Sequence, residues 1–328
     1  MALSNRKPSM DAELRKGLEN VSLPAISHAT PEVIEMMRRA TATPPSYLED
    51  LKSQGISHRE VRIPKKDGSN SEIILSILQP VSESNKPRPC MYWIHGGGLH
   101  WGDRLHTLEF PSDVVLEYDA ICVSVEYGLA PEHSLSEALE DCYAGLEWTS
   151  EHMEELGIDA NRLMIGGSSA GGLLATSTAL LCRDREGPVL CAQCLICPML
   201  DDRLSTASCQ QYTENSDFLP SSLFEDVWKS SLKKDRESSS AGIIIPGRIE
   251  DLSRLPTTYL DVGSAEVLRD DVVAYASKLW TNGIQAELHV WAGGFHGFDI
   301  FLPDVAVSQA SRKAKMAWVK KVFGSNQS

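Results

Sequence analysis

The chain has 328 residues, of which 42% are apolar and 23% charged, the composition of an ordinary globular protein. This composition excludes intrinsic disorder, collagen and a coiled coil as descriptions of the whole chain. The 31 basic and 45 acidic residues give a net charge of −14. Such a surface repels the phosphates of nucleic acids, so we expect no nucleic-acid partner.

The chain also lacks apolar segments of targeting length. The first twenty residues hold no signal-peptide-like run, and no stretch reaches about eighteen apolar residues, the length of a membrane span. We therefore expect a cytoplasmic protein without stable membrane insertion. Most of the eight cysteines lie in apolar stretches, where thiols act as small buried hydrophobic groups. Cys191, Cys194 and Cys197 have metal-like spacing, but Asp201 stands where a ferredoxin-type run needs its fourth cysteine, so we expect no metal.

Residues 1–55 are predicted to be helical with loops. Pro31 predicts the start of a helix that runs to Arg39, because proline suits the first turn. Residues 58–64 and 72–78 then alternate apolar and polar side chains on either side of a Lys-Lys-Asp-Gly-Ser turn, which predicts a β-hairpin.

After the hairpin, short apolar runs alternate with longer helical patterns. The runs are too continuously apolar for a half-exposed sheet and indicate buried parallel strands. This alternation predicts an α/β fold with about eight strands, mostly parallel and flanked by helices. The strand candidates are 90–94, 120–126, 162–165, 192–197, 257–262 and 286–290. The helix candidates are 136–153, 170–183, 268–282 and 305–322, the first preceded by a capping box of Ser134 and Glu137.

The segment 201–250 breaks this rhythm. It contains no clear strand, one helical stretch at 221–232 and a charged, serine-rich run at 233–240. We expect that run to be a solvated loop. The whole segment is interpreted as an excursion from the sheet that covers the top of the domain.

The sequence Gly167-Ser168-Ser169-Ala170-Gly171 matches G-x-S-x-G, with Ser169 at the nucleophile position. An apolar strand precedes it and a helix follows it, which is the setting that this motif requires. The sharp turn exposes the serine hydroxyl, and the helix N-terminus lies beneath the developing negative charge. Ser169 is therefore the predicted nucleophile.

A second glycine-rich turn, His95-Gly96-Gly97-Gly98, follows the buried strand 90–94. Consecutive glycines let the backbone approach a ligand closely. We expect the N–H groups of Gly97, Gly98 and Ala170 to form an oxyanion hole.

A serine nucleophile needs a base and an acid that orients it. His296 lies between glycines directly after the last strand, so it is the predicted base. Glu266, Asp270 and Asp271 compete as the acid. Glu266 comes three residues after Gly263 ends the preceding strand and is preferred, since the two aspartates are expected in a helix's first turn, where acids are favoured anyway.

Together these motifs resemble the hormone-sensitive-lipase-like branch of the α/β-hydrolases, which includes bacterial esterases. The resemblance implies an α/β-hydrolase domain over 56–328 with a helical cap, built from residues 1–55 and an insertion at about 201–250. Three positions depart from the family pattern: Ser168 replaces Asp or Thr, Glu266 replaces the commoner Asp, and Gly128 replaces Arg. The matching segments are HGGG at 95–98, YGLAPE at 127–132, GSSAGG at 167–172, VGSAEVLRDD at 262–271 and HGF at 296–298.

The predicted function is hydrolysis of carboxylic esters with small to medium acyl groups, through an acyl-enzyme on Ser169 and without a cofactor. The same groups would suit a thioesterase, acyltransferase or condensing enzyme, because water and other nucleophiles compete for one acyl-enzyme. A non-catalytic receptor, as in the related plant gibberellin receptors, is disfavoured because His296 is present. The resemblance also implies a homodimer through the sheet edge near the last strand. The candidate pocket residues are Leu99, His100, Trp101, Phe218, Leu219 and Phe224.

Overall fold

In the computed structural model, which describes residues 6–21, 26–213, 218–238 and 243–324, the strands form one sheet in the order β1-β2-β4-β3-β5-β6-β7-β8. The hairpin β1-β2 is antiparallel, β2 pairs antiparallel with β4, and every other pair is parallel. The mostly parallel eight-stranded sheet predicted from the sequence is thus confirmed. The strands are β1 (Ile56–Pro64), β2 (Glu72–Pro80), β3 (Arg88–Ile94), β4 (Ile121–Val125), β5 (Ile158–Ser168), β6 (Ala192–Ile196), β7 (Thr257–Gly263) and β8 (Ala286–Trp291).

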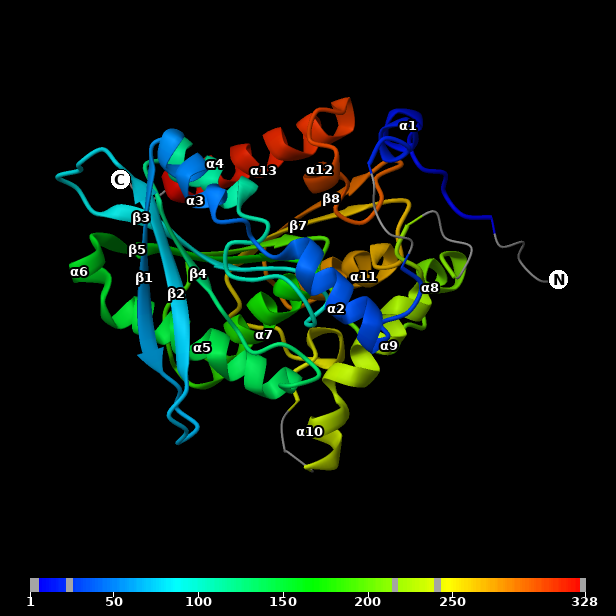
Figure 1. Cartoon of the computed structure of the whole chain (residues 1–328), viewed down its shortest axis with the longest axis horizontal. Coiled ribbons are helices and arrows are strands. Elements are labelled where there is room, and N and C mark those ends of the chain that lie inside the picture. Colours follow the sequence, from blue (N-terminus) through cyan, green and yellow to red (C-terminus); the bar gives the residue numbers. More distant parts are fainter. Residues whose placement is uncertain (1–5, 22–25, 214–217, 239–242, 325–328) are drawn as a thin grey trace.

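Helices cover both faces of this sheet. Helices α4 and α13 lie on one face, and α5, α7 and α11 lie on the other (Figure 1). The helices are α1 (Ala12–Leu18), α2 (Pro31–Thr41), α3 (Ser46–Ser53), α4 (Glu109–Glu117), α5 (Leu135–Glu151), α6 (Met153–Leu156), α7 (Ala170–Asp184), α8 (Ala207–Gln211), α9 (Ser221–Ser231), α10 (Lys233–Glu237), α11 (Arg269–Thr281), α12 (Phe298–Phe301) and α13 (Ala306–Gly324), with a 3-10 turn η1 at Pro246–Arg248.

Burial on both faces explains why the central strands have continuous apolar runs. In β3, Tyr92 packs into the core beneath α5 and α7, while Met91 and Trp93 pack into the core beneath α4 and α13. All seven residues of this strand are buried. A strand with helices on both faces has no solvent side, so polar alternation is absent.

Capping side chains explain where two of the helices begin. Ser134 and Glu137 form the predicted capping box at the start of α5, each bonding the other's backbone N–H. Thr30 caps α2, where Pro31 occupies the first turn. The sequence-based expectation for Lys233–Ser240 is wrong in part, because Lys233–Glu237 forms α10 rather than a loop. Residues 239 and 240 of that run lie outside the described residues.

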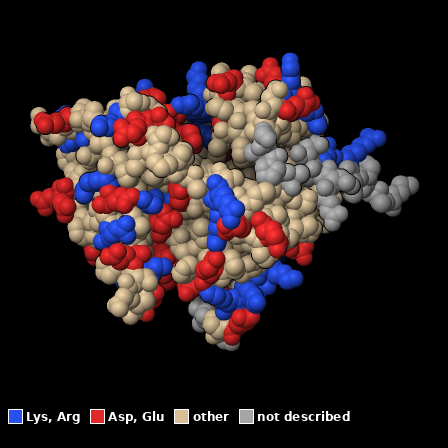
Figure 2. All heavy atoms as spheres, viewed as in Figure 1, with Lys and Arg blue, Asp and Glu red and all other residues tan. Residues whose placement is uncertain are grey.

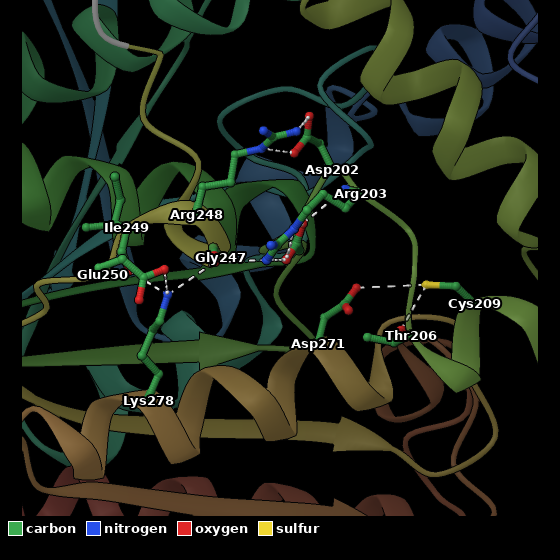
Figure 3. A network of polar contacts seen from close by, with 11 residues as sticks. Asp202, Arg203, Thr206, Cys209, Gly247, Arg248, Ile249, Glu250, Asp271 and Lys278 are labelled. Carbon is green, nitrogen blue, oxygen red and sulfur yellow. Dashed lines mark hydrogen bonds and ion pairs between the residues drawn. The ribbon is translucent and has the colours of Figure 1, made fainter.

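The two ends of the insertion at 201–250 lie side by side (Figure 3). Asp202, near its start, forms a two-pronged ion pair with Arg248, near its end, at 2.5 and 2.9 Å. Arg203 donates to the Gly247 carbonyl at 3.1 Å, and Lys278 of α11 donates to the Ile249 carbonyl at 2.7 Å. The two ends of the insertion are therefore fastened to each other and to the body.

None of the described helices is both long enough and apolar enough to cross a bilayer. On the face seen in Figure 2, acidic and basic side chains are interspersed rather than gathered into one basic field.

Candidate active site

Ser169 lies on the sharp turn between β5 and α7. Its φ of 54° is in the left-handed region, which a residue with a side chain adopts only when its surroundings impose it. The Ser169 N–H donates to the Ile196 carbonyl at 2.8 Å, and its carbonyl accepts from Met199 at 3.0 Å. Gly171 is required behind the turn, since a Cβ there would lie 2.0 Å from the Ile94 carbonyl oxygen. The backbone thus holds the serine in a strained position.

His296 and Glu266 complete a chain of hydrogen bonds from this serine. His296 Nε2 lies 2.9 Å from Ser169 Oγ, and His296 Nδ1 lies 2.6 Å from Glu266 Oε2. The other Glu266 oxygen accepts from the Gly263 N–H at 3.0 Å, which fixes the carboxylate at the end of β7. The structure therefore brings together the three residues that the sequence analysis singled out, at the carboxyl ends of three parallel strands.

The groups around the His296 ring make its imidazole more basic than usual. Burial of the ring disfavours its charged form, but Cys197 and Glu266 beside it outweigh burial and raise the pKa of His296 well above its usual value. Such a ring, with its Nε2 directed at a hydroxyl, can accept that hydroxyl's proton.

The competing acids lie elsewhere. Asp270 and Asp271 occupy the first turn of α11, and Asp270 accepts hydrogen bonds from Ser208 and Arg269. Among the described residues, no group of three or more His, Cys, Asp or Glu side chains could hold a metal ion.

The turn at 95–98 lies beside the serine, and Gly96, Gly97 and Gly98 line the same cavity as Ser169. His95 anchors the turn rather than facing the cavity. Its ring stacks on Tyr127 at 4.3 Å and its Nδ1 lies 2.7 Å from the Gly96 carbonyl oxygen. Burial lowers the pKa of His95 to about 4, so the ring is neutral near pH 7.

The cavity above the triad has a volume of about 380 Å³ and is lined mainly by apolar side chains. Of the candidate pocket residues, Trp101, Phe218, Leu219 and Phe224 line it. Leu99 and His100 do not: both are buried beneath the turn, and His100 Nδ1 lies 2.6 Å from the Gly98 carbonyl oxygen. Further lining residues come from the N-terminal segment and the insertion: Ile26, Met37, Ala40, Thr41, Leu223 and Val227.

Two features of the site were not predicted from the sequence. Cys197, at the end of β6, places its Sγ 4.0 Å from His296 Nε2 and lines the cavity. Arg38 of α2 donates from Nε to the His100 carbonyl at 2.8 Å, and Thr41 accepts from the Gly102 N–H at 3.1 Å. These bonds join segments about sixty residues apart, so no local sequence pattern reveals them.

Comparisons with known proteins agree with this geometry. A family model described as "alpha/beta hydrolase fold" matches residues 91–300. The chain is 31% identical to "Esterase LipI" of Mycobacterium tuberculosis, over 90% of this chain and 89% of that protein. It is 30% identical to "Carboxylesterase NlhH" of the same species, over 97% of each. The solved structure of a "Bacterial Heroin Esterase" superposes with a TM-score of 0.84 at 32% identity, over 96% of this chain and 98% of that one.

Proposed function

The chain belongs to the α/β-hydrolase family, and from that premise we propose that it is a serine carboxylesterase that works through an acyl-enzyme on Ser169. The observation that carries the proposal is the unbroken chain of hydrogen bonds from Ser169 through His296 to Glu266. The named relatives are esterases and carboxylesterases, which supports the same reaction class.

The first half-reaction forms the acyl-enzyme. His296 Nε2 takes the Ser169 proton while Oγ attacks the ester carbonyl carbon. The N–H groups of Gly97, Gly98 and Ala170 stabilise the oxyanion, and His296 then protonates the leaving alcohol. Glu266 holds the tautomer of His296 and stabilises its cation. Water reverses these steps and releases the acid.

The cavity restricts the substrate to uncharged esters with small to medium acyl groups. Its walls are mainly apolar, and among the residues that the structure describes no Lys, Arg, Asp or Glu side chain lines it. A charged group would lose its hydration there without gaining a partner.

The proposed cap consists of residues 1–55 and the insertion at about 201–250, above a catalytic domain of residues 56–328. Met37 and Thr41 from the first part and Leu223 and Val227 from the second line the cavity, which supports this division. The substrate is then enclosed between the cap and the carboxyl ends of the strands.

The proposal also includes a cytoplasmic location and a homodimer. Eight unpaired cysteines, seven of them buried, suit a reducing compartment. The edge strand β8 exposes Val290, and Trp280 of α11 is 48% exposed, which suits pairing of two β8 edges. Light scattering on the purified protein tests the dimer.

The experiment is hydrolysis of p-nitrophenyl esters from acetyl to dodecanoyl by the wild type, Ser169→Ala and His296→Ala. We expect activity to peak at a short or medium acyl length and to fall by about 10⁴-fold or more in both variants. Ser277→Ala and His289→Ala, which change partly exposed side chains on α11 and β8, serve as controls. Near-wild-type rates in both active-site variants would contradict the proposal.

A further inference from the structure

A second cavity lies on the other side of the nucleophile turn from the cap. It has a volume of about 170 Å³ and is lined by residues at the ends of β3, β5 and β6 and by residues of α4 and α13. It shares three lining residues with the substrate cavity: Thr107, Ser168 and Ile300. These three residues form the wall between the two cavities.

The second cavity also continues outward. A surface groove beside Leu116 and Met316 shares Asp113 and Arg312 with it, and these two side chains form an ion pair. The Arg312 side chain is 54% exposed. Groove, second cavity and substrate cavity therefore form a series from the surface near α4 and α13 to the nucleophile.

Charged and polar side chains line part of the second cavity, and some of their polar atoms are incompletely satisfied. Four buried side-chain atoms on its walls have no hydrogen-bond partner among the described residues: Trp93 Nε1, Thr107 Oγ1, Asp113 Oδ2 and Ser308 Oγ. Buried polar atoms normally have a partner, and this set contains both donors and acceptors, as bound water requires. The volume has room for about five waters at roughly 30 Å³ each.

The charges on its walls argue against an anionic occupant. Glu109, Asp113 and Asp299 contribute three carboxylates, while the two cations, Arg312 and Lys315, are already paired with Asp113 and Asp299. The remaining negative charge repels the carboxylate product of ester hydrolysis but admits water.

Thr107 is strained at the wall between the cavities. Its φ is 60°, a left-handed conformation that is a genuine outlier for a β-branched residue. Strain of this kind persists where the surrounding structure imposes it, often at functional positions. Thr107 lines both cavities, and its hydroxyl has no hydrogen-bond partner among the described residues.

Resting on the proposed esterase function, we propose that the second cavity holds the water that hydrolyses the acyl-enzyme, with Thr107 as the positioning residue that passes it to the site. The water oxygen bonds to the acyl carbonyl carbon while His296 Nε2 takes one of its protons. The carbon–Oγ bond to Ser169 then breaks, His296 returns the proton to Oγ, and the carboxylic acid leaves.

The test separates deacylation from acylation. Wild type, Thr107→Val and Ser308→Leu are mixed with a limiting amount of p-nitrophenyl butyrate. Nitrophenol release gives the acylation rate, and intact-protein mass spectrometry follows the decay of the acyl group. Thr178→Val is the matched control, because its buried hydroxyl also lacks a partner within the described part of the chain, but Thr178 lies on α7 and lines neither cavity.

We expect Thr107→Val to slow decay by about fivefold, the change for one lost hydrogen bond, and to slow acylation much less. Ser308→Leu, which fills the cavity, slows decay as well. Added methanol, entering beneath the cap, restores turnover in both variants. Equal decay in wild type and Thr107→Val, or an equal loss in acylation, would overturn the water route. Nitrophenol release that is equal in wild type and Ser169→Ala would instead overturn the esterase proposal.

Discussion

Arg38 of helix α2 and Glu132, in the turn after β4, form a two-pronged ion pair with N–O distances of 2.9 and 2.6 Å. The same guanidinium donates to two backbone carbonyls, those of His100 at 2.8 Å and Ala130 at 2.9 Å. Arg38 therefore ties the N-terminal segment to the loop that follows the glycines proposed to form the oxyanion hole.

Replacing Arg38 should weaken catalysis more than the folded state. Glu132 is 57% exposed, so the ion pair itself contributes little, whereas the two carbonyl bonds fix the loop. We expect Arg38→Met to lower kcat by about tenfold through misplacement of that loop, with a smaller change in KM. Arg39→Met is the control, because Arg39 is 78% exposed on the same helix. An equal loss in both variants, measured on one ester, would refute this role.

Two neighbouring glycines should respond differently to alanine. At Gly97, with φ of 110°, a Cβ would lie 2.0 Å from the Trp101 carbonyl oxygen, so the turn must move. At Gly98, with φ of 58°, the nearest atom is a Val227 methyl at 3.4 Å, an ordinary contact. We expect Gly97→Ala to lose at least about 10²-fold in kcat, as for a lost oxyanion donor, and Gly98→Ala to lose much less. Steady-state kinetics with melting temperatures for both variants test this, and a reversed order would contradict it.

The pH dependence of kcat/KM should report the pKa of His296. The ring must be unprotonated to act as a base, so activity rises with pH through its pKa, which Cys197 and Glu266 raise against the effect of burial. Glu266→Gln removes one of these causes. We expect the rising limb to move to lower pH while the rate falls by about 10³- to 10⁴-fold.

Asp270→Asn is the control for this profile, since Asp270 bonds Ser208 and Arg269 rather than the imidazole. This variant should leave the rising limb of the pH profile at the wild-type position. A Glu266→Gln profile whose rising limb stays at the wild-type position would show that Glu266 does not influence the titrating group.

Asp271, beside the base of the insertion, should make stability depend on pH (Figure 3). Burial, with Asp201 and Asp270 nearby, raises its pKa to about 7. Because the folded state then binds more protons than the unfolded state between about pH 4 and pH 7, the free energy of unfolding falls as pH rises through this window.

Asp271→Asn should remove this fall in the free energy of unfolding with rising pH. At one pKa unit per about 1.4 kcal/mol, we expect the variant to gain about 1 to 3 kcal/mol relative to wild type between pH 5 and pH 8. Urea denaturation at the two pH values measures it, with the exposed Asp304→Asn as control. A difference between variant and wild type that is the same at both pH values would contradict the assignment.

Helices and strands that are marked by a local sequence pattern could be predicted from the sequence. The buried strands, the capping box of Ser134 and Glu137, and the α/β-hydrolase fold could all be predicted from runs, spacing and motifs. Helix α10 could not, because Lys233–Glu237 is charged throughout and its pattern equally suits a solvated loop.

The parts of the site that could not be predicted from the sequence depend on contacts between residues far apart in the chain. Ser169 and His296 are marked by glycine-rich motifs, but the approach of Cys197 to His296 joins residues 99 positions apart. The wall at Thr107 borders a cavity that residues of α4, α12 and α13 line together with Ser168 at the end of β5. Such contacts depend on how whole helices and strands pack together, so no short stretch of sequence predicts them.

The fastened ends of the insertion bear on how this enzyme could diversify. Asp202 and Arg248 close the insertion at its base, so the chain leaves and re-enters the catalytic body at a single point. A segment grafted between these two residues keeps the attachment points of the insertion, but it must also replace the contact of Phe224 with His296. The pair thus marks a boundary for chimeras, and the packing on His296 sets the condition that such chimeras must meet.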